Sequence, residues 1–386
     1  MADFDDAASS PEDEEQLWAE LGRCVSSRCD SHETIDDALS SWFDLTTRLR
    51  DRCSDSPDGI ATCAHMLLAS DLFRNNKEYV RSQLVSSLLQ GDETGPLHAV
   101  TCFLLLDGCQ DETVFPRMID TACFPRLLEL INGRQHIDQL LHRHLLQLMY
   151  EMVRVHRLRV DDFVQVNDEF VHFLFSLIEE VTDEVRDPYH DPTTRVLLVL
   201  NEQYMVASVG SATDPSSPTS PLTNRIVKCL SLHGPSFRTF QENIILLLSH
   251  ETEMSLQLLI LKLLYLLFTN KATYEYFYTS DLRVLLDVII RNLMDLPDEK
   301  IALRHVYLRV LHPLLAHTQF NQPPHYKQDK ILRVLNILRG SHNARFAPAD
   351  ETTLRLVDRC FRIKWVAEAD QSCSPGSGEP RCHASS

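Results

Sequence analysis

Apolar residues recur at intervals of three and four along almost the whole chain, and this spacing places them on one face of an α-helix. Alternating runs of β-branched residues, which are typical of half-buried strands, do not occur in the sequence. The pattern therefore predicts an all-α protein without strands. The predicted helices span residues 14–28, 33–53, 58–73, 76–90, 96–109, 120–132, 136–157, 160–181, 192–209, 220–232, 236–248, 252–268, 270–278, 281–294, 298–317, 326–339 and 349–367.

Residues that stop a helix lie in most of the breaks between these segments. Proline fixes φ and lacks a donor, and glycine adopts the left-handed backbone conformation. Examples are Ser-Pro-Asp-Gly at 56–59, Asp187-Pro188 and His-Gly-Pro at 233–235. The chain is thus expected to be a series of helices joined mostly by short links.

Weak self-similarity suggests that these helices form repeats. The run FPRLLELI at 124–131 matches LRVLLDVI at 282–289, and FLFSLI at 173–178 resembles both. The spacings are compatible with multiples of the roughly 40–47-residue period of HEAT and armadillo units, in which each unit buries its apolar face only against its neighbours. We expect an armadillo/HEAT-like helical repeat solenoid, with chance matches between leucine-rich helices as the alternative.

The most apolar stretch is LQLLILKLLYLLF at 256–268. It contains Lys262 and is shorter than the roughly 20 residues that cross a bilayer. We therefore expect a buried core helix and no membrane insertion.

Polar segments set the expected domain boundaries. Residues 1–13 form an acidic tail and residues 368–386 a Pro-, Gly- and Ser-rich tail, and neither can offset its ordering entropy by burial. Both are expected to be disordered, which leaves an armadillo-like domain at 14–367. An internal loop at 210–221 contains Ser217 and Ser220, each before a proline. This loop is either a passive linker or a site of proline-directed phosphorylation.

Composition excludes several functional classes. The chain of 386 residues has 55 acidic residues against 37 Lys and Arg, a net charge of -18, which argues against nucleic-acid binding because that requires clustered cations. Only 11 glycines occur, and neither the glycine-rich phosphate-binding loops nor the nucleophile elbow of serine hydrolases has a match. Nucleotide enzymes and serine hydrolases are therefore not expected.

Cysteine usage and the first residues of the chain favour the cytoplasm. The 11 cysteines are scattered without a CxxC pair, which fits neither a disulfide framework nor a zinc site. The first 15 residues, MADFDDAASSPEDEE, hold seven acids and no base, unlike a signal or transit peptide.

Histidine and acid clusters give no catalytic or metal site. His142 and His144 are two residues apart and so cannot share a helix face, and His136 does not complete a set with them. His32-Glu33 and His250-Glu251 start an HExxH-like pattern but lack its second histidine. We predict no catalytic residue, no metal, no cofactor and no enzymatic activity.

Positive charge gathers near the C-terminal end of the helical region. Between Lys327 and Lys364 there are nine bases against four acids. Two stripes of basic residues on predicted helices and two residues of the 252–268 helix are candidate contacts for a protein partner, in a groove lined by the last helix of each unit. An ordinary wetted helix face is the alternative for each. The candidates are Lys262, Tyr265, His305, Arg309, His312, Arg355, Arg359 and Arg362.

Three long stretches, at 248–268, 277–288 and 303–315, carry a resemblance to a known family, and NEQYM at 201–205 adds a fourth. They resemble the leucine-rich armadillo domain of the WISH/DIP family. The similarity is extended over 197–317 and reaches from about residue 14 to 367. Because the predicted helices begin by about residue 14, without a preceding Src-homology domain, the chain looks like the short fungal form of the family.

The resemblance implies a non-enzymatic activator of the actin-related protein 2/3 complex. Such a protein binds that complex, acts on actin only indirectly, and starts unbranched filaments without a preformed filament. These filaments seed branched networks at cortical actin patches during endocytosis. The alternative function is a generic armadillo-type scaffold or adaptor that binds a peptide or helix in its groove.

Overall fold

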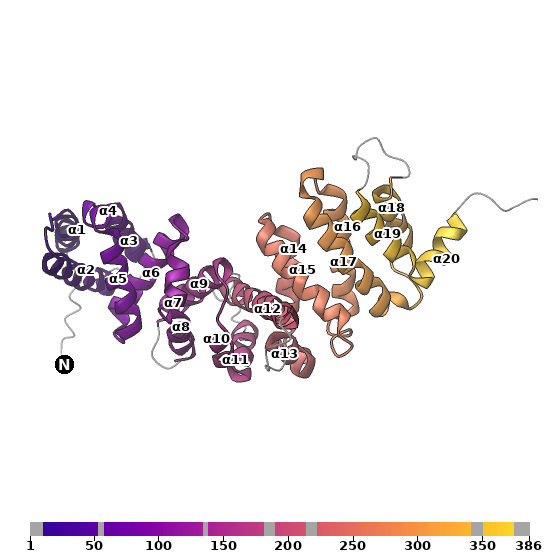
Figure 1. Ribbon diagram of the computed structural model, residues 1–386, viewed down its shortest axis with the longest axis horizontal. Coiled ribbons are helices and arrows are strands. Elements are labelled where there is room, and N and C mark those ends of the chain that lie inside the picture. The colour runs from indigo at the N-terminus through magenta and orange to yellow at the C-terminus, as the bar shows by residue number, and fades with distance from the viewer. Residues whose placement is uncertain are drawn as a thin grey trace, which may run out of the picture. The chain divides into compact units, whose positions relative to one another are not determined.

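The computed structural model describes residues 11–52, 58–133, 138–180, 190–213, 222–340 and 350–373 (Figure 1). Every regular element within these ranges is a helix. The all-α prediction is confirmed, and the successive packing of the helices described below is that of an armadillo/HEAT-like repeat solenoid. The chain divides into two compact units, Met1–Gln203 and Tyr204–Ser386, with the boundary inside one long helix.

The first unit contains helices α1 to α11 and the start of α12. They are α1 (Pro11–Val25), α2 (His32–Arg52), α3 (Asp58–Ala69), α4 (Asp71–Asn75), α5 (Lys77–Gln90), α6 (Thr94–Gln110), α7 (Val114–Asp120), α8 (Cys123–Asn132), α9 (Gln139–Val155), α10 (Val160–Gln165), α11 (Asp168–Glu179) and the start of α12 (His190–Thr213).

The second unit holds the end of α12 and the helices after it. They are α13 (Arg225–His233), α14 (Arg238–His250), α15 (Met254–Thr269), α16 (Thr279–Asp295), α17 (Ile301–His317), α18 (Gln328–Leu338), α19 (Glu351–Phe361) and α20 (Lys364–Cys373), with short 3-10 turns at Gly234–Ser236, Asp298–Lys300 and Gln319–Asn321.

Several predicted helices differ from the structure. The helix predicted at 58–73 is divided into α3 and α4, because Ser70 caps the start of α4. The helix predicted at 160–181 is divided into α10 and α11, because Asn167 caps the start of α11. Helix α7 lies in a segment for which no helix is predicted.

Two further predicted helices also differ. The segment 270–278 is a series of turns, in which Asn270 Oδ1 accepts from Ala272 N and Tyr276 Oη donates to the carbonyl of Phe237. The single helix predicted at 349–367 is instead α19 followed by α20. Val357 of α19 is buried, as are Trp365 and Val366 of α20, so the break lets both short helices bury their apolar sides.

The predicted tail and loop boundaries also shift. Helix α1 begins at Pro11 because proline's fixed φ suits the first helical turn, and α12 continues to Thr213. Helix α20 continues to Cys373, with Ala369 buried and Asp370 accepting from Asn336 Nδ2 at 3.4 Å. Helix therefore occupies 11–13, 210–213 and 368–373, and the remainder of the predicted tails and loop lies outside the described residues.

In the first unit, α6 is the central helix and packs against α2, α3, α5 and α9. Most residues of α6 are buried, as its mainly apolar sequence predicts. One buried charge, Asp107, is matched by Arg81 of α5, whose Nε and Nη2 each lie 2.7 Å from a carboxylate oxygen. Gly108 allows close contact, because a Cβ there would meet the Phe115 ring at 2.2 Å.

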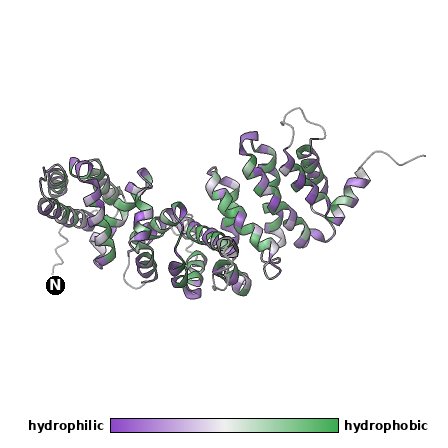
Figure 2. Ribbon diagram, viewed as in Figure 1, coloured by the Kyte–Doolittle hydropathy of each residue, from purple (hydrophilic) through white to green (hydrophobic). Residues whose placement is uncertain are grey.

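The second unit is a stack of two layers of helices. Helices α14, α16 and α18 pack in series in one layer, and α15, α17 and α19 pack in series in the other. Figure 2 shows α15 as hydrophobic over most of its length, and nine of its side chains are buried, from Leu256 to Phe268. The predicted core helix is thus an interior element of this unit.

Polar side chains tie several repeats to the one before. Trp365 Nε1 donates to the carbonyl of Leu315 at 3.3 Å, and His317 Nδ1 donates to that of Phe268 at 2.8 Å. In the first unit, Gln203 Nε2 donates to Val153 at 2.8 Å. Each acceptor lies in the last turn of a helix, where carbonyls have no intrahelical partner. The partners are 49 or 50 residues apart, which is slightly longer than the predicted period.

A pair of buried histidines lies between α6 and α9. The rings of His98 and His144 are 5.9 Å apart, and His98 is only 1% exposed. Neither ring nitrogen of His98 has a hydrogen-bond partner among the described residues. Burial lowers the pKa of both histidines to about 4, against the opposing charge of Asp138, and the neighbouring Arg50 also lowers the pKa of His98. Both imidazoles are therefore neutral at pH 7.

We expect this pair to make the first unit sensitive to acid. A folded-state pKa of about 4 against 6.5 when unfolded means that the stabilisation is complete above pH 6.5 and falls as the pH drops toward 4. Chemical denaturation at pH 7.5 and 5.0 measures the loss. In His98→Leu the free energy of unfolding should fall less over this interval, by on the order of 1 kcal/mol. Equal losses in the two proteins would contradict this role.

Candidate protein-binding surface

Three arginines lie on the outer side of α19 and at its C-terminal end. Arg355, Arg359 and Arg362 are exposed, while Val357 is buried against the neighbouring helices. Arg355 has a long ion pair with Glu351, at 3.9 Å, and donates to Thr352 Oγ1 at 3.4 Å. Arg362 is the C-cap residue of α19 and therefore lies at the C-terminal end of this helix. The predicted division into a basic outer side and an apolar inner side is therefore present.

Helix α17 adds bases beside those of α19, against which it packs. Arg309 is exposed and has no ion pair within the ranges that the structure describes. His312 is half-buried, and burial lowers its pKa to about 4, with further lowering by the nearby Arg359. At neutral pH His312 is thus an uncharged neighbour of the arginines. Arg309, His312, Arg355, Arg359 and Arg362 are called the basic face below.

His305 lies on the same side of α17 as Arg309, as predicted, but its side chain bonds within the protein. Its side chain is 17% exposed, and Nε2 lies 3.1 Å from Asp350 Oδ1 and 3.1 Å from Thr353 Oγ1. Asp350 is the N-cap of α19 and accepts from the backbone N–H groups of Thr352 and Thr353, at 2.9 and 3.1 Å. His305 therefore holds the start of α19 against α17, and a partner would find little of its ring exposed.

The Asp350 side chain that forms this cap strongly favours its ionised form. Burial would raise the pKa of Asp350, but hydrogen bonds from the Thr353 side chain and backbone and from His305 outweigh it. Together they hold the pKa well below its usual range. The start of α19, and with it the position of the basic face, thus depends on a charged Asp350.

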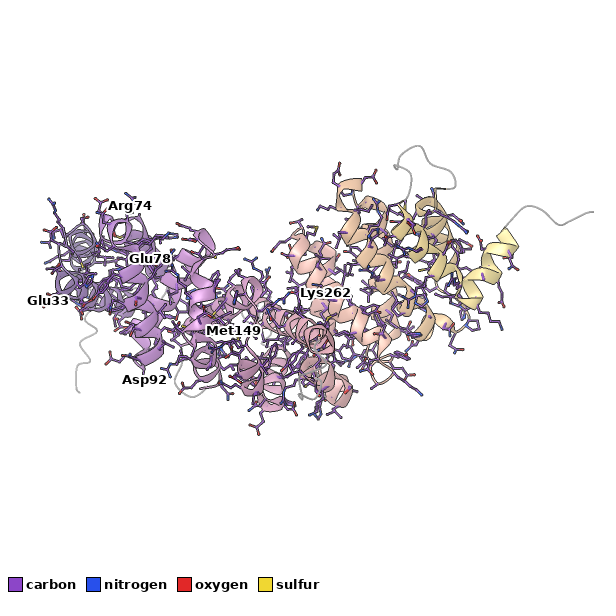
Figure 3. The ribbon with its side chains drawn as sticks, in the orientation of Figure 1. Glu33, Arg74, Glu78, Asp92, Met149 and Lys262 are labelled. Carbon is purple, nitrogen blue, oxygen red and sulfur yellow. The ribbon has the colours of Figure 1, made fainter. Side chains whose placement is uncertain are left out.

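Lys262 and Tyr265 lie on α15, and Figure 3 labels Lys262 there. Both side chains are half-buried. They are three residues apart and therefore share one side of the helix, together with Leu258 and Leu266, which are also half-buried. Two of the four residues on this side are leucines, whereas the basic face of α17 and α19 contains only arginines and a histidine.

A cavity of about 220 Å³ lies where α12, α13 and α15 meet, within the second unit. Met205 and Ser208 of α12, Val227 of α13 and Leu266 of α15 contribute to its wall. Helical periodicity gives no sign of this cavity, because its wall combines residues from three separated segments. None of these four residues was a candidate from the sequence.

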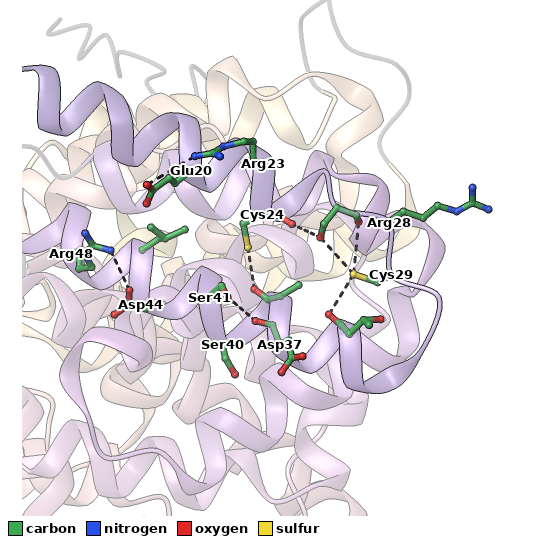
Figure 4. Close-up of a pocket in the computed structure, with 14 residues that line it drawn as sticks. Glu20, Arg23, Cys24, Arg28, Cys29, Asp37, Ser40, Ser41, Asp44 and Arg48 are labelled. Carbon is green, nitrogen blue, oxygen red and sulfur yellow. Dashed lines mark hydrogen bonds and ion pairs between the residues drawn. The ribbon is translucent and has the colours of Figure 1, made fainter.

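A larger cleft of about 930 Å³ lies between α1 and α2 (Figure 4). Its arginines are matched by nearby acids. Arg23 lies 4.0 Å from Glu20, and Arg48 lies 3.5 Å from Asp44. The Cys24 thiol donates to the carbonyl of Ala38 at 3.2 Å. Because its charges compensate one another, this cleft lacks the uncompensated basic character of α17 and α19.

The described residues contain no group of three or more His, Cys, Asp or Glu side chains arranged to hold a metal ion. His142 bonds the carbonyl of Ile131 at 2.9 Å while His144 faces His98, so the two lie on different sides of α9 as predicted. His136 lies outside the described residues. No helix that the structure describes is long and apolar enough to cross a membrane.

Comparison with known proteins shows a match to one domain family. The family model of the SPIN90/Ldb17 leucine-rich domain matches residues 186–331, which include α13 to α17. Protein dip1 of Schizosaccharomyces pombe is 28% identical over 375 residues, covering 96% of this chain and 98% of dip1. Residues 186–331 thus match the SPIN90/Ldb17 leucine-rich domain, and the chain is similar to dip1 over nearly its whole length.

Two further relatives carry the name Protein LDB17. The one from Saccharomyces cerevisiae is 30% identical over 241 residues, covering 60% of this chain and 46% of that protein. The one from Eremothecium gossypii is 25% identical over 344 residues, covering 82% of this chain and 72% of that protein. These similarities agree with the WISH/DIP resemblance seen in the sequence.

Solved structures give weaker likenesses. The designed armadillo repeat protein YIII(Dq)4CqI has a TM-score of 0.36 and 10% identity, covering 73% of this chain and 98% of that one. SYS-1 has a TM-score of 0.49 and 13% identity, covering 92% of this chain and 69% of that one. The assignment of the fold therefore rests on the helix packing of this chain itself.

We predict that Asp350→Ala destabilises the second unit by about 1 kcal/mol, because two N–H groups of α19 lose their acceptor. Asp350→Asn keeps a capping oxygen and should cost less, with the remaining loss due to the missing charge beside His305. Urea denaturation followed by circular dichroism measures both. If neither variant differs from the wild type, the cap does not hold α19.

Proposed function

We propose that this chain binds the actin-related protein 2/3 complex and stimulates it to start unbranched actin filaments without a preformed filament. The proposal rests first on similarity to the WISH/DIP family, whose leucine-rich domain the family model places at 186–331. In this proposal the chain acts by binding alone and catalyses no reaction.

The observation that carries the proposal on this chain is its basic face. A chain with a net charge of -18 exposes Arg309, Arg355, Arg359 and Arg362 on two adjacent helices. Arginine is favoured at protein interfaces, because its planar guanidinium can make two parallel bonds to a carboxylate. An acidic ridge or helix of the partner complex is the complementary surface.

Activation would follow from a difference in affinity. A ligand shifts a conformational equilibrium only as far as it binds one state more tightly than the other. A rigid stack of helices can recognise the active arrangement of a partner by shape, since its own repeats are fixed by buried contacts. We propose that the second unit binds the active arrangement of the complex more tightly than the resting one.

The same proposal places the chain in the cytoplasm at cortical actin patches. Filaments started there would seed branched networks during endocytosis. Contact with actin is indirect, through the complex, and neither nucleic acid nor membrane insertion is part of the function.

The test of this surface is charge reversal. The triple variant Arg355→Glu, Arg359→Glu and Arg362→Glu should weaken binding to the purified complex by roughly 30-fold, mainly through slower association. Helicity and melting temperature should stay unchanged, because all three side chains are exposed. Biolayer interferometry measures the binding.

A matched control carries the same charge change elsewhere. Arg23→Glu, Arg28→Glu and Arg48→Glu reverse three arginines that line the N-terminal cleft. This control should bind as the wild type does. Unchanged binding by the α19 variant would remove the basic face from the proposal. If the wild-type chain binds the complex but does not accelerate actin assembly, the scaffold or adaptor function is favoured instead.

A further inference from the structure

The cavity between α12, α13 and α15 has a mainly apolar wall. Met205, Leu222, Val227 and Leu266 line it. Its volume of about 220 Å³ exceeds the roughly 150 Å³ at which an apolar cavity in a protein core accepts a benzene ring. Several wall residues, including Ser208 and Leu266, are exposed or half-buried, so the cavity reaches the protein surface. It is large enough for one bulky side chain.

Several polar side chains around the cavity bond to the local backbone. Asn224 Oδ1 accepts from the N–H groups of Ile226 and Val227, at 3.1 and 3.2 Å. Asn270 Oδ1 accepts from Ala272 N at 3.1 Å, and Ser208 Oγ donates to the carbonyl of Met205 at 2.7 Å. In each of these bonds, a polar side-chain atom is paired with the nearby backbone. The cavity is therefore suited to an apolar group.

The cavity adjoins the side of α15 that carries the candidate contacts. Leu266 is one turn from Lys262, and Thr269, which also lines the cavity, donates its hydroxyl to the carbonyl of Tyr265 at 2.7 Å. Helix α15 packs on α17, and α17 packs on α19. One continuous row of helices thus connects the cavity to the basic face.

We propose that this cavity is a socket for a bulky apolar side chain, such as Leu, Phe or Trp, of the actin-related protein 2/3 complex. This inference rests on the proposed function and adds a second anchor point to its interface. Neighbouring helices lie about 8–10 Å apart, so α19 lies roughly 20 Å from α15. The partner segment therefore carries its acidic residues about 20 Å from its apolar anchor, a distance of roughly 13 residues along a helix.

Socket and basic face have separable effects on the rates of binding. Exposed charges steer the encounter and set the association rate and its salt dependence. A bulky side chain that is fully desolvated in a pocket acts after contact and slows dissociation. Changes in the socket should therefore raise the dissociation rate with little change in association.

Two variants close the socket in different ways. Ser208→Trp fills it from an exposed position on α12, and Met205→Glu places a carboxylate in its wall. In Leu246→Trp the same indole is added on α14, where Leu246 is 58% exposed and outside the socket. The full chain is used throughout, and circular dichroism and melting confirm folding, so that either variant alone can decide.

Binding to the purified complex is measured by biolayer interferometry at two salt concentrations. The expected result is a dissociation rate about 10-fold higher for both socket variants, with the association rate and salt dependence of the wild type. Leu246→Trp should match the wild type. A folded socket variant that dissociates at the wild-type rate would overturn the socket while the proposed function stands. Absence of binding by the wild type itself would overturn the proposed function and the socket with it.

Discussion

Burial of one repeat's apolar side by the next is the constraint on which the rest of the structure depends. Helix α15 illustrates it, because its sequence is apolar almost all round and no single neighbour could cover it. Helices α14 and α17 pack against it from different sides. The ends of such helices leave backbone carbonyls without partners, and Trp365 and His317 of later repeats supply the missing donors. Packing and end-capping together set the spacing of the repeats.

This constraint also determines which residues remain for function. Side chains that face a neighbouring repeat are used for stability, and those on the outer sides of α15, α17 and α19 can meet a partner. His305 shows that the distinction is not one of residue type. It lies on the same stripe as Arg309, yet it bonds the N-cap Asp350 and fixes the start of α19. Under the proposed function, its role is to position the arginines beside it.

The family and the physical account support each other at different levels. The similarity to the WISH/DIP family supports the proposal that the partner is the actin-related protein 2/3 complex, and the chemistry of this chain suggests how such a contact would be made. Exposed arginines on α17 and α19 suit an acidic surface, and an apolar cavity beside α15 suits a bulky side chain. At many protein interfaces, exposed charges set the association rate and a buried apolar anchor sets the dissociation rate.

Much of the fold could be predicted from the sequence, because hydrophobic periodicity directly reports which side of a helix is buried. The positions of α9, α15 and α17 follow from it, as does the outward side of α19. The turns at 270–278 and the break before α20 could not be predicted, since they depend on contacts such as Tyr276 with Phe237. The role of His305 and the cavity at Met205 and Leu266 also depend on distant segments. Such contacts leave no trace in the local spacing of apolar residues.

Filament growth in a purified system tests the central claim most directly. The chain is mixed with the actin-related protein 2/3 complex and fluorescent actin, without filament seeds or another activator, and filaments are imaged as they form. The account predicts linear filaments whose number rises with the concentration of the chain and requires the complex. No acceleration over the complex and actin alone would contradict activation, whether or not the chain binds the complex.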